Sequence, residues 1–324
     1  MTIKKIELHV HLEGTISPRL AKLFAERNHC IIPPNVISPD GERYLFRDFL
    51  HFLSVFDVIA GLIKTPQDYY DLTFDYLESS ARDDVIYVEM MYSPEHAEKM
   101  TGIPSIEHLT AIQQAIHDAE KRYGIVGRVI IVAVRHFGVE ASIRTAERAL
   151  SECLPVVVGF GLGGDELNFP PHLFQRAFTI ASEGGLLCTA HAGEFGDASC
   201  MLEAINSLPI QRIGHGVQAI HSPDMMALLR DKNIALEVCP SSNITFGLFK
   251  DFAHHPFPEL LKAGIAVSIS SDDPPFVHTT VAKEYTLVQA AYGYSDADMI
   301  SITRQAISHS FAPHHLKESL LNQL

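Results

Sequence analysis

The stretch Lys4-Lys5-Ile6-Glu7-Leu8-His9-Val10-His11-Leu12-Glu13-Gly14 decides the fold of this chain. Apolar and polar residues alternate along it with a period of two until it ends at a glycine, a pattern typical of a β-strand. On such a strand Glu7, His9, His11 and Glu13 share one face. Two imidazoles that lie one strand repeat apart can form half of a transition-metal site. The stretch therefore predicts a strand that carries metal ligands.

Seven further apolar runs follow this strand, and helical patterns separate them. The runs are short, rich in β-branched residues and almost uninterrupted by polar residues, and they cover 85–92, 128–135, 155–162, 185–191, 212–217, 234–239 and 266–271. Such strands, alternating with helices, indicate a parallel sheet covered by helices. Eight repeats predict a closed (β/α)8 barrel, the TIM barrel. A doubly wound open sheet is the alternative, but no Gly-x-Gly-x-x-Gly follows the first strand.

The connection after the first strand is much longer than the others. About seventy residues separate the first two strands, far more than a usual βα connection. We expect 1–324 to form a single domain with a helical insertion at about 15–84. Apolar residues of the insertion form a stripe that fits either a lid or ordinary core packing. The predicted helices of the insertion cover 17–28, a segment that begins at Phe46, and 65–81.

The composition is that of a folded globular enzyme, because 47% of the 324 residues are hydrophobic and 20% are charged. The net charge of −14 argues against nucleic acid and anionic membranes as partners. No apolar run is long enough to span a bilayer, and no signal peptide is visible. The five cysteines show no CxxC spacing and are predicted to be reduced thiols of a cytoplasmic protein.

Polar or ionisable residues follow five of the eight predicted strands. In a TIM barrel the catalytic residues lie at these carboxyl ends of the strands. His9, His11, His191 and Asp272 offer three nitrogens and one carboxylate, a set that suits one catalytic Zn²⁺ with a further position for water. Such a metal lowers the pKa of its water to about 7. No lysine follows the fourth strand to bridge a second metal, so we expect one metal per chain.

Five motifs resemble those of the adenosine deaminase family of amidohydrolase barrels, in the same order and at barrel spacing. The resemblance covers essentially the whole chain. It implies a hydrolase that deaminates a 6-aminopurine, by attack of zinc-activated hydroxide on purine C6 while N1 is protonated. The expected partner is thus a small purine nucleoside or base. The motifs are Glu7–Gly14, His191–Glu194, Arg212–Gly216, Glu237–Asn243 and Ser271–Pro274.

The resemblance also implies the role of each residue in the chemistry. His9, His11, His191 and Asp272 match the zinc ligands of the family. Glu194 matches the acid that protonates purine N1, which requires a raised pKa. His215 matches the residue that orients and deprotonates the water. Asp273 matches the carboxylate near the water and N7. The backbone of Gly164 matches the donor to N3.

A further set of residues matches the family's substrate pocket. His11 belongs to this set as well as to the ligands, and so does Asp273. Glu13 matches the carboxylate that contacts the ribose 5′-hydroxyl. Phe52, Leu53 and Phe56 match the apolar lid over the purine, although plain packing would explain the same residues.

The exact substrate depends on signals that disagree. Gly163-Gly164-Asp165-Glu166 and Gly214 favour adenosine and 2′-deoxyadenosine, because adenine-specific relatives tend to carry Ser-Ser-Glu and Asp at these two places. Glu13 favours the alternatives, since many adenosine deaminases have Asp there and adenine deaminases commonly have Glu. Adenosine is the first reading. Adenine and a 5′-modified nucleoside, such as an aminofutalosine-like compound, stay open.

Two classes of protein other than a purine deaminase receive little support. A purine-binding barrel without turnover would be expected to lack a ligand or Glu194, and a hydrolase of amides or esters would have no task for Glu194. Arg135 and His136 follow a strand without an assigned role. The oligomeric state is not readable. Four histidines in polar loops or helix starts are expected to face solvent: His254, His255, His314 and His315.

Overall fold

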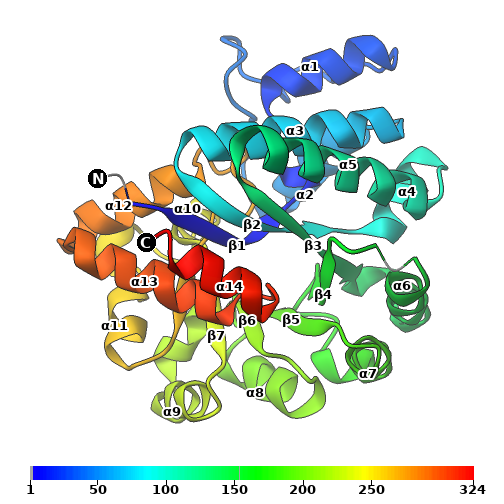
Figure 1. The fold of residues 1–324 in the computed structure, drawn as a ribbon. Helices are drawn as coiled ribbons and strands as arrows, with labels where there is room; N and C mark the ends of the chain where they lie inside the picture. Colours follow the sequence, from blue (N-terminus) through cyan, green and yellow to red (C-terminus); the bar gives the residue numbers. More distant parts are fainter. Residues whose placement is uncertain (1–2, 153) are drawn as a thin grey trace.

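Eight parallel strands form the barrel at the centre of the molecule (Figure 1). The structure is a computed structural model that describes residues 3–152 and 154–324, so the predicted thiol of Cys153 lies outside it. Neighbours in the sheet follow the order of the chain from β1 to β8, which confirms the predicted (β/α)8 barrel. The strands are β1 (Lys5–His11), β2 (Val85–Tyr92), β3 (Val126–Val134), β4 (Val157–Gly163), β5 (Leu187–Ala192), β6 (Arg212–His215), β7 (Ala235–Val238) and β8 (Val267–Ile269).

Helices surround the strands on the outside of the barrel (Figure 1). None of the helices in the described part of the chain is long and apolar enough to cross a membrane. The helices are α1 (Pro18–Arg27), α2 (Phe49–Ala60), α3 (Pro66–Arg82), α4 (Pro94–Thr101), α5 (Ser105–Tyr123), α6 (Val139–Ser151), α7 (Gln175–Glu183), α8 (Ala198–Ser207), α9 (Pro223–Asp231), α10 (Pro240–Thr245), α11 (Phe257–Lys262), α12 (Val281–Tyr292), α13 (Asp296–His309) and α14 (His314–Leu321).

The three helices α1, α2 and α3 occupy the long connection between β1 and β2, in the segments where the sequence predicts them. Each begins at a residue that caps its free backbone N–H groups. The side chain of Ser17 accepts a hydrogen bond from the backbone of Leu20, and that of Asp48 accepts one from His51. Thr65 and Asp68 form a reciprocal capping box at the start of α3.

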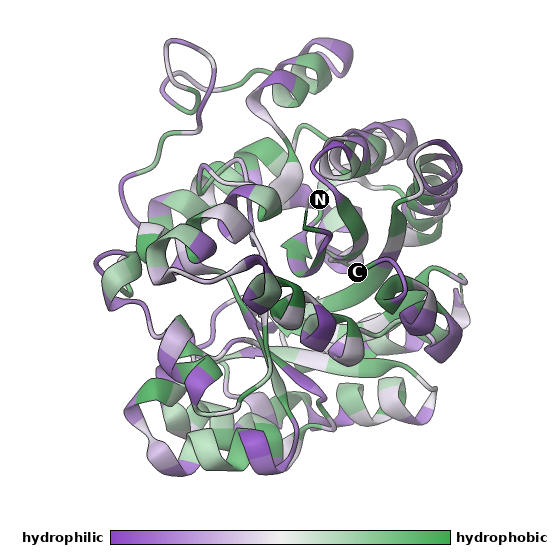
Figure 2. Cartoon of the chain, turned by 60° about the vertical axis from the view of Figure 1, so that its left-hand side comes forward, coloured by the Kyte–Doolittle hydropathy of each residue, from purple (hydrophilic) through white to green (hydrophobic). Residues whose placement is uncertain are grey.

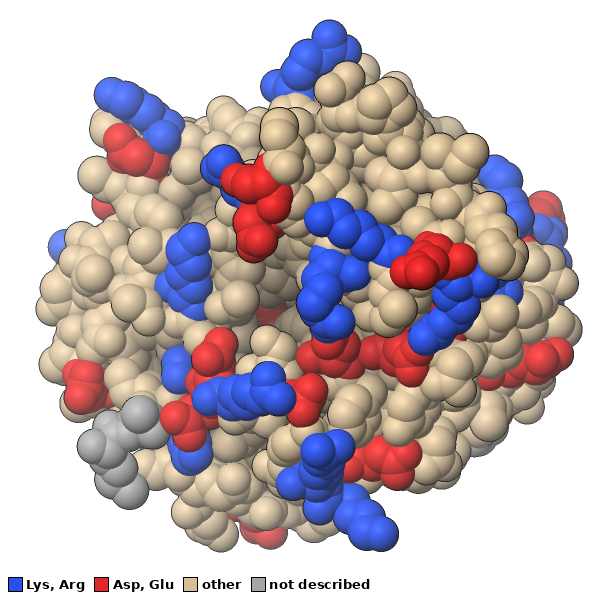
Figure 3. Space-filling view, turned by 90° about the horizontal axis from the view of Figure 1, so that it is seen from above, with Lys and Arg blue, Asp and Glu red and all other residues tan. Residues whose placement is uncertain are grey.

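Apolar side chains of the strands and helices fill the space between them, and hydrophilic residues lie along many of the helices (Figure 2). The amino-terminal end of the barrel has its own apolar cluster, in which Ile6 and Leu8 of β1 pack with Ile307 of α13 and Leu320 of α14. The carboxyl ends of the strands, by contrast, carry the ionisable residues. On the surface, acidic and basic side chains are intermixed over the face drawn in Figure 3.

Two expectations about individual residues are wrong. Glu13 does not extend the polar face of β1, because the backbone becomes helical at Leu12 and Glu13 begins a short 3-10 helix that ends at Thr15. His255 does not face solvent: its side chain is 2% exposed and hydrogen-bonds to Asn243 and to the backbone of Phe257. The polar sequence around His255 hid this buried position.

Candidate metal centre and active site

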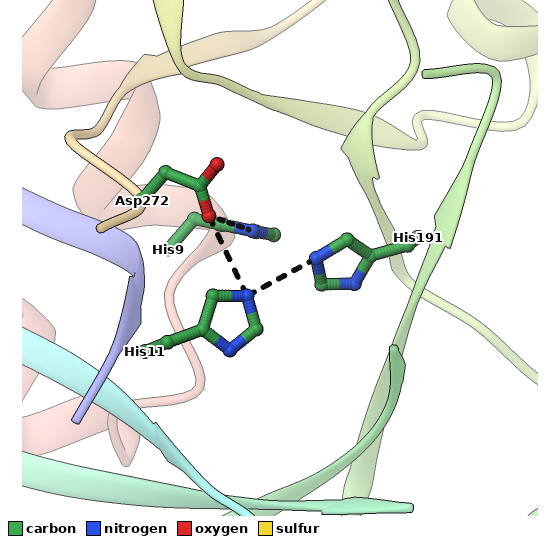
Figure 4. A group of neighbouring side chains, drawn as sticks. All are labelled: His9, His11, His191 and Asp272. Carbon is green, nitrogen blue, oxygen red and sulfur yellow. Dashed lines mark hydrogen bonds and ion pairs between the residues drawn. The ribbon is translucent and has the colours of Figure 1, made fainter. Parts of the chain in front are cut away.

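Four potential metal ligands converge inside the carboxyl-terminal mouth of the barrel (Figure 4). His9 and His11 come from β1, His191 comes from β5, and Asp272 follows β8. Their donor atoms all lie within 4.8 Å of one another. Nε2 of His11 lies 3.3 Å from Nε2 of His191 and 3.5 Å from Oδ1 of Asp272, and Nε2 of His9 lies 3.6 Å from the same oxygen.

Closure of the barrel places the carboxylate beside the histidines. The backbone N–H of His11 donates to the carbonyl of Asp272 at 2.9 Å, and the N–H of Asp272 donates to the carbonyl of His9 at 3.2 Å. Asp272 has a positive φ of 65°, a rare conformation for a residue other than glycine. Its side chain therefore reaches the cluster through a backbone turn that the pairing with β1 holds in place.

Hydrogen bonds on the far side of the His9 and His191 rings orient these rings, so that their Nε2 atoms face the cluster. Nδ1 of His9 lies 2.7 Å from Oε2 of Glu237, and Nδ1 of His191 lies 3.0 Å from the carbonyl of Leu162. Because a carbonyl and a carboxylate only accept, both Nδ1 atoms carry hydrogen, and in its neutral form each ring then presents a lone pair at Nε2. Oδ2 of Asp272 accepts from Ser242 at 2.6 Å, so Oδ1 faces the rings.

A divalent metal fits this arrangement. Nε2 of His9 is buried and makes no hydrogen bond within the described residues, which is costly unless another group binds it. Three imidazole nitrogens and one carboxylate oxygen are the donors that catalytic zinc sites use. The cluster thus suits a metal ion in its chemistry as well as in its spacing.

A buried network of ion pairs supports the ring of His9 through Glu237. Arg212 donates from Nε to Glu237 at 2.5 Å and from Nη2 to Glu89 at 2.6 Å, and all three side chains are fully buried. Burial raises the pKa of Glu237, but the charge of Arg212 and the hydrogen bond from His9 outweigh it and lower that pKa to about 2. Glu237 is therefore ionised and holds the hydrogen of His9 on Nδ1.

Glu194 and His215 lie next to the four ligands. Oε2 of Glu194 is 3.6 Å from Nε2 of His215, which is 3.9 Å from Oδ2 of Asp272. Burial, together with the charges of Asp272 and Glu166, raises the pKa of Glu194 well above its usual range. The raised pKa favours the protonated side chain, which can donate a proton as a general acid must.

A chain of hydrogen bonds determines which ring nitrogen of His215 carries the hydrogen. The backbone N–H of Phe257 donates to Nδ1 of His255 at 3.2 Å, so Nε2 of His255 carries hydrogen and donates to Oδ1 of Asn243 at 3.2 Å. The amide nitrogen of Asn243 then donates to Nδ1 of His215 at 3.2 Å. Burial lowers the pKa of His215 to about 3, and the neutral ring carries its hydrogen on Nε2, toward Glu194.

The predicted substrate-binding residues lie around the same opening. Gly164 follows β4 with a φ of 92°, which brings its backbone close to His136. Glu13 is buried and accepts a hydrogen bond from the hydroxyl of Tyr69 at 3.1 Å. Asp273 is buried beside Asp272, and burial with that neighbouring charge raises its pKa well above the usual range.

Helix α2 belongs to an aromatic cluster. The ring of Phe52 lies 4.7 Å from that of Phe246 and 5.6 Å from that of Phe276, and Phe56 lies 5.6 Å from Phe276. Phe52 is 4% exposed, whereas Leu53 is 40% exposed. Two of the three predicted lid residues thus pack into the cluster, and Leu53 lies on its exposed side.

The sequence did not single out several residues that the structure places around the site. Glu237 and Asn243 lie within a quoted motif, and Glu166 lies within the segment after β4, but nothing in those patterns indicated which atoms they contact. The sequence assigns no role to Arg135, whose guanidinium donates to the carbonyl of His191 at 2.5 Å. These residues act on the backbone or on ring orientation, which a one-dimensional pattern does not show.

Comparison with known proteins decides the family. The model of the family described as adenosine deaminase matches residues 4–324. This chain belongs to the adenosine deaminase family. It is therefore a hydrolytic deaminase that acts on C–N bonds.

Three relatives of this adenosine deaminase family member are close over nearly their whole length. An adenine deaminase of Rhizobium leguminosarum bv. trifolii is 39% identical over 322 residues, which cover 99% of each chain. The structure of an adenine deaminase from Arthrobacter aurescens has a TM-score of 0.94 and 30% identity, and covers 99% of this chain and 98% of its own. An N6-methyl-AMP deaminase from Arabidopsis thaliana has a TM-score of 0.84 at 25% identity, with 98% and 95% covered.

Proposed function

We propose that this protein is a zinc-dependent adenine deaminase that converts adenine and water into hypoxanthine and ammonia. One observation carries the choice of substrate: a relative named adenine deaminase is 39% identical over 99% of both chains. The similar fold of an adenine deaminase at a TM-score of 0.94 points the same way. The sequence favours adenosine as the substrate and keeps adenine as an alternative. We propose adenine instead.

The two glycine signals that favoured adenosine have structural explanations. A Cβ on Gly214 would lie 2.8 Å from Cε1 of His9, so the packing of a ligand ring already requires glycine there. Gly164 has a positive φ, and a Cβ on it would lie 3.1 Å from Nδ1 of His136. In this chain both glycines fit the packing of the neighbouring His9 and His136 side chains, which accounts for them without a role in the choice of substrate.

Glu13 supports a substrate without a ribose. Its carboxylate is buried, and one of its oxygens already accepts a hydrogen bond from Tyr69. Burial also raises the pKa of Glu13 and so favours a neutral side chain. The family pattern, in which adenine deaminases commonly carry Glu at this place, agrees with this environment.

The proposed metal is one Zn²⁺, held by His9, His11, His191 and Asp272. Bound zinc would polarise a water molecule and lower its pKa toward 7. His215 would donate from Nε2 to the reacting oxygen and hold it in line with purine C6. This donor role differs from the deprotonating role that the family resemblance implied, because Asn243 occupies the acceptor side of the ring.

The other residues would act on the purine ring. Protonated Glu194 would give its proton to N1 while the water oxygen adds to C6, so that the electrons of the ring double bond are taken up by N1. The backbone N–H of Gly164 would donate to N3, and Asp273 would hold the edge at N7. The two protons of the water would balance the step: one would join the amino group, which departs as ammonia and leaves the C6 oxygen, and the other would restore the proton of Glu194. Acid–base help of this kind contributes about 10²–10⁴-fold to the rate.

The test is the ultraviolet absorbance change of zinc-loaded protein with adenine and, separately, with adenosine. We expect adenine to be turned over with a kcat/KM at least about tenfold higher than adenosine, a difference of about 1.4 kcal/mol. Faster turnover of adenosine would overturn the choice of substrate. If neither adenine nor adenosine is turned over, 5′-modified nucleosides would be assayed next.

A matched variant makes the substrate test sharper. Glu13→Asp shortens the carboxylate by one methylene and moves it away from Tyr69. We expect the ratio of kcat/KM for adenosine over adenine to rise in this variant, with zinc content unchanged. An unchanged ratio would show that Glu13 does not contribute to the choice between base and nucleoside.

A further inference from the structure

The carboxylate of Glu166 accepts hydrogen bonds from three consecutive backbone N–H groups. Gly193 donates to Oε1, while Glu194 and Phe195 donate to Oε2 at 3.2 and 3.0 Å. Glu166 follows β4 and the three donors follow β5, so the contact joins two neighbouring strand ends. It places a single side chain against the backbone of the proposed catalytic acid.

The loop fits closely around this carboxylate. Glu166 is 5% exposed, and a Cβ on Gly196 would lie 2.7 Å from its Oε1. Gly193 has a φ of 72°, the left-handed conformation that turns its N–H and the next ones toward one point. Three successive N–H groups that face one anion form the nest known from phosphate sites, here filled by the protein's own carboxylate.

The carbonyl groups of the same loop are held from the other side. Gln218 donates from its backbone N–H to the carbonyl of Gly193 at 3.0 Å and from its side chain to the carbonyl of Glu194 at 3.2 Å. Arg135 donates to the carbonyls of His191 and Phe169, each at 2.5 Å. The loop after β5 thus has partners on both edges, and among the described residues Glu166 accepts from the N–H groups of Gly193, Glu194 and Phe195.

We propose that Glu166 is a positioning residue that fixes the carboxyl group of Glu194 at the place where purine N1 lies. This inference rests on the proposed deaminase chemistry and concerns the placement of its acid. A catalytic group must be held within a fraction of an ångström of its productive position, and a shift of 1 Å can cost about 10²-fold in rate. Glu194 follows the β5 strand by two residues, so its position depends on how the loop is held.

The first test compares Glu166→Gln and Glu166→Ala in metal-loaded enzyme. The glutamine keeps one acceptor oxygen, which can bind the N–H groups of Glu194 and Phe195, but it presents an amide to Gly193. We expect kcat to fall in the order wild type, Glu166→Gln, Glu166→Ala, by about 10²-fold in the last. KM and metal content should stay within about twofold, because substrate and metal contact other groups.

Asp197 supplies the matched control. Asp197 lies in the same loop, but its carboxylate accepts hydrogen bonds from Ser199 and Cys200 at the start of α8 and not from the N–H groups of 193–195. Asp197→Asn should leave kcat unchanged. An equal fall in kcat for this control and for Glu166→Gln would overturn the proposal, because it would show a general sensitivity of the loop.

A double-mutant cycle tests the route through Glu194. When Glu194→Gln has already removed the acid, removal of Glu166 should lower the residual rate by less than about threefold, whereas the single Glu166→Ala change costs far more. Additive losses in the cycle would overturn the proposal. The cycle uses whichever purine the wild type deaminates, so a wrong choice between adenine and adenosine does not affect it.

Amide hydrogen exchange gives a readout that does not need turnover. We expect the amides of 193–195 to lose protection in Glu166→Ala, with the exchange of β4 and β5 unchanged. Unchanged protection of the loop would overturn the proposal. Loss of protection throughout the barrel would do so as well, because Glu166 would then maintain the fold and have no selective effect on the acid. Inactive wild type with a protected loop would count against the proposed function alone.

Discussion

Which ring nitrogen of His215 carries the hydrogen depends on the backbone N–H of Phe257 in α11. The N–H of Phe257 can only donate, so the chain through His255 and Asn243 has one direction and ends at Nδ1 of His215. The ring is thereby prepared as a donor at Nε2. The proposed chemistry needs this tautomer, and the same reasoning applies to His9 and His191, whose rings are held by Glu237 and Leu162.

The first prediction concerns Asn243. Asn243→Asp replaces the amide donor with a carboxylate oxygen, which draws the hydrogen of His215 to Nδ1 and leaves Nε2 without one. A catalytic histidine in the wrong tautomer loses much of its activity, so we expect kcat to fall by about 10²–10⁴-fold while metal content is retained. Steady-state kinetics and metal analysis measure both. Asn233→Asp is the control, because Asn233 lies beside His309 and far from the active site. A normal kcat in Asn243→Asp would contradict the assigned tautomer.

The second prediction concerns the acid itself. Glu194→Gln keeps the size of the side chain but removes the proton that N1 receives. We expect kcat to fall by about 10²–10⁴-fold, with zinc content and thermal stability close to those of the wild type. Retention of more than a tenth of the activity would refute the role of Glu194 as the acid.

At the scale of elements, the third prediction concerns α2. Phe52→Ala removes a ring that packs against Phe246 and Phe276. If α2 covers the purine, KM should rise by at least about tenfold, with a smaller change in kcat, because the lost contact is made equally before and during the reaction. Leu50→Ala is the matched control on the same helix, where the side chain is 75% exposed. If the aromatic side chains of α2 serve only for packing, Phe52→Ala should instead lower the free energy of unfolding and leave KM unchanged.

The elements were predictable because each strand and helix has a local signal, and the strand ends follow from the barrel. His9, His191 and Asp272 meet in space although they are far apart in sequence, since the carboxyl ends of all strands share one face. Contacts such as Glu237 with His9 were not predictable, because they depend on side-chain direction and on the register of neighbouring strands. Glu13 left the strand although the alternation of residues continues through it, since the backbone turns at Leu12.

For the whole molecule, the fourth prediction concerns metal removal. The proposed ligands join β1, β5 and the end of β8, so a bound metal links the two edges where the barrel closes. Chelation should abolish activity and lower the melting temperature, and added Zn²⁺ should restore both. A metal at about 100 times its Kd contributes about 2.7 kcal/mol to the free energy of unfolding. His9→Ala should show no response of its melting temperature to chelator; a full response would place the metal elsewhere.

The fifth prediction concerns acid stability. Burial lowers the pKa of His255 to about 3, whereas the unfolded chain has an ordinary value of about 6.5. Between these values the unfolded state binds a proton that the folded state does not, so the free energy of unfolding falls as pH decreases below about 6.5. The loss from this residue reaches about 2 kcal/mol at pH 5.

Urea unfolding at pH 7.5 and pH 5 measures this loss. His255→Gln should lose less stability than the wild type over that interval, because the titrating ring is gone. His254→Gln changes the exposed neighbouring histidine and should behave like the wild type. An equal loss in His255→Gln and the wild type would show that other buried groups account for the acid sensitivity.

The pairing of Asp272 with the first strand also has a consequence for synthesis. A ribosome makes the three histidines within the first 191 residues, but the carboxylate arrives only with the last strand, and its place beside them depends on the hydrogen bonds to His9 and His11. A growing chain therefore lacks the complete ligand set until nearly all of it has left the exit tunnel. The proposed metal would then be bound late in the synthesis of each molecule, and fragments that end before Asp272 would lack the complete proposed site.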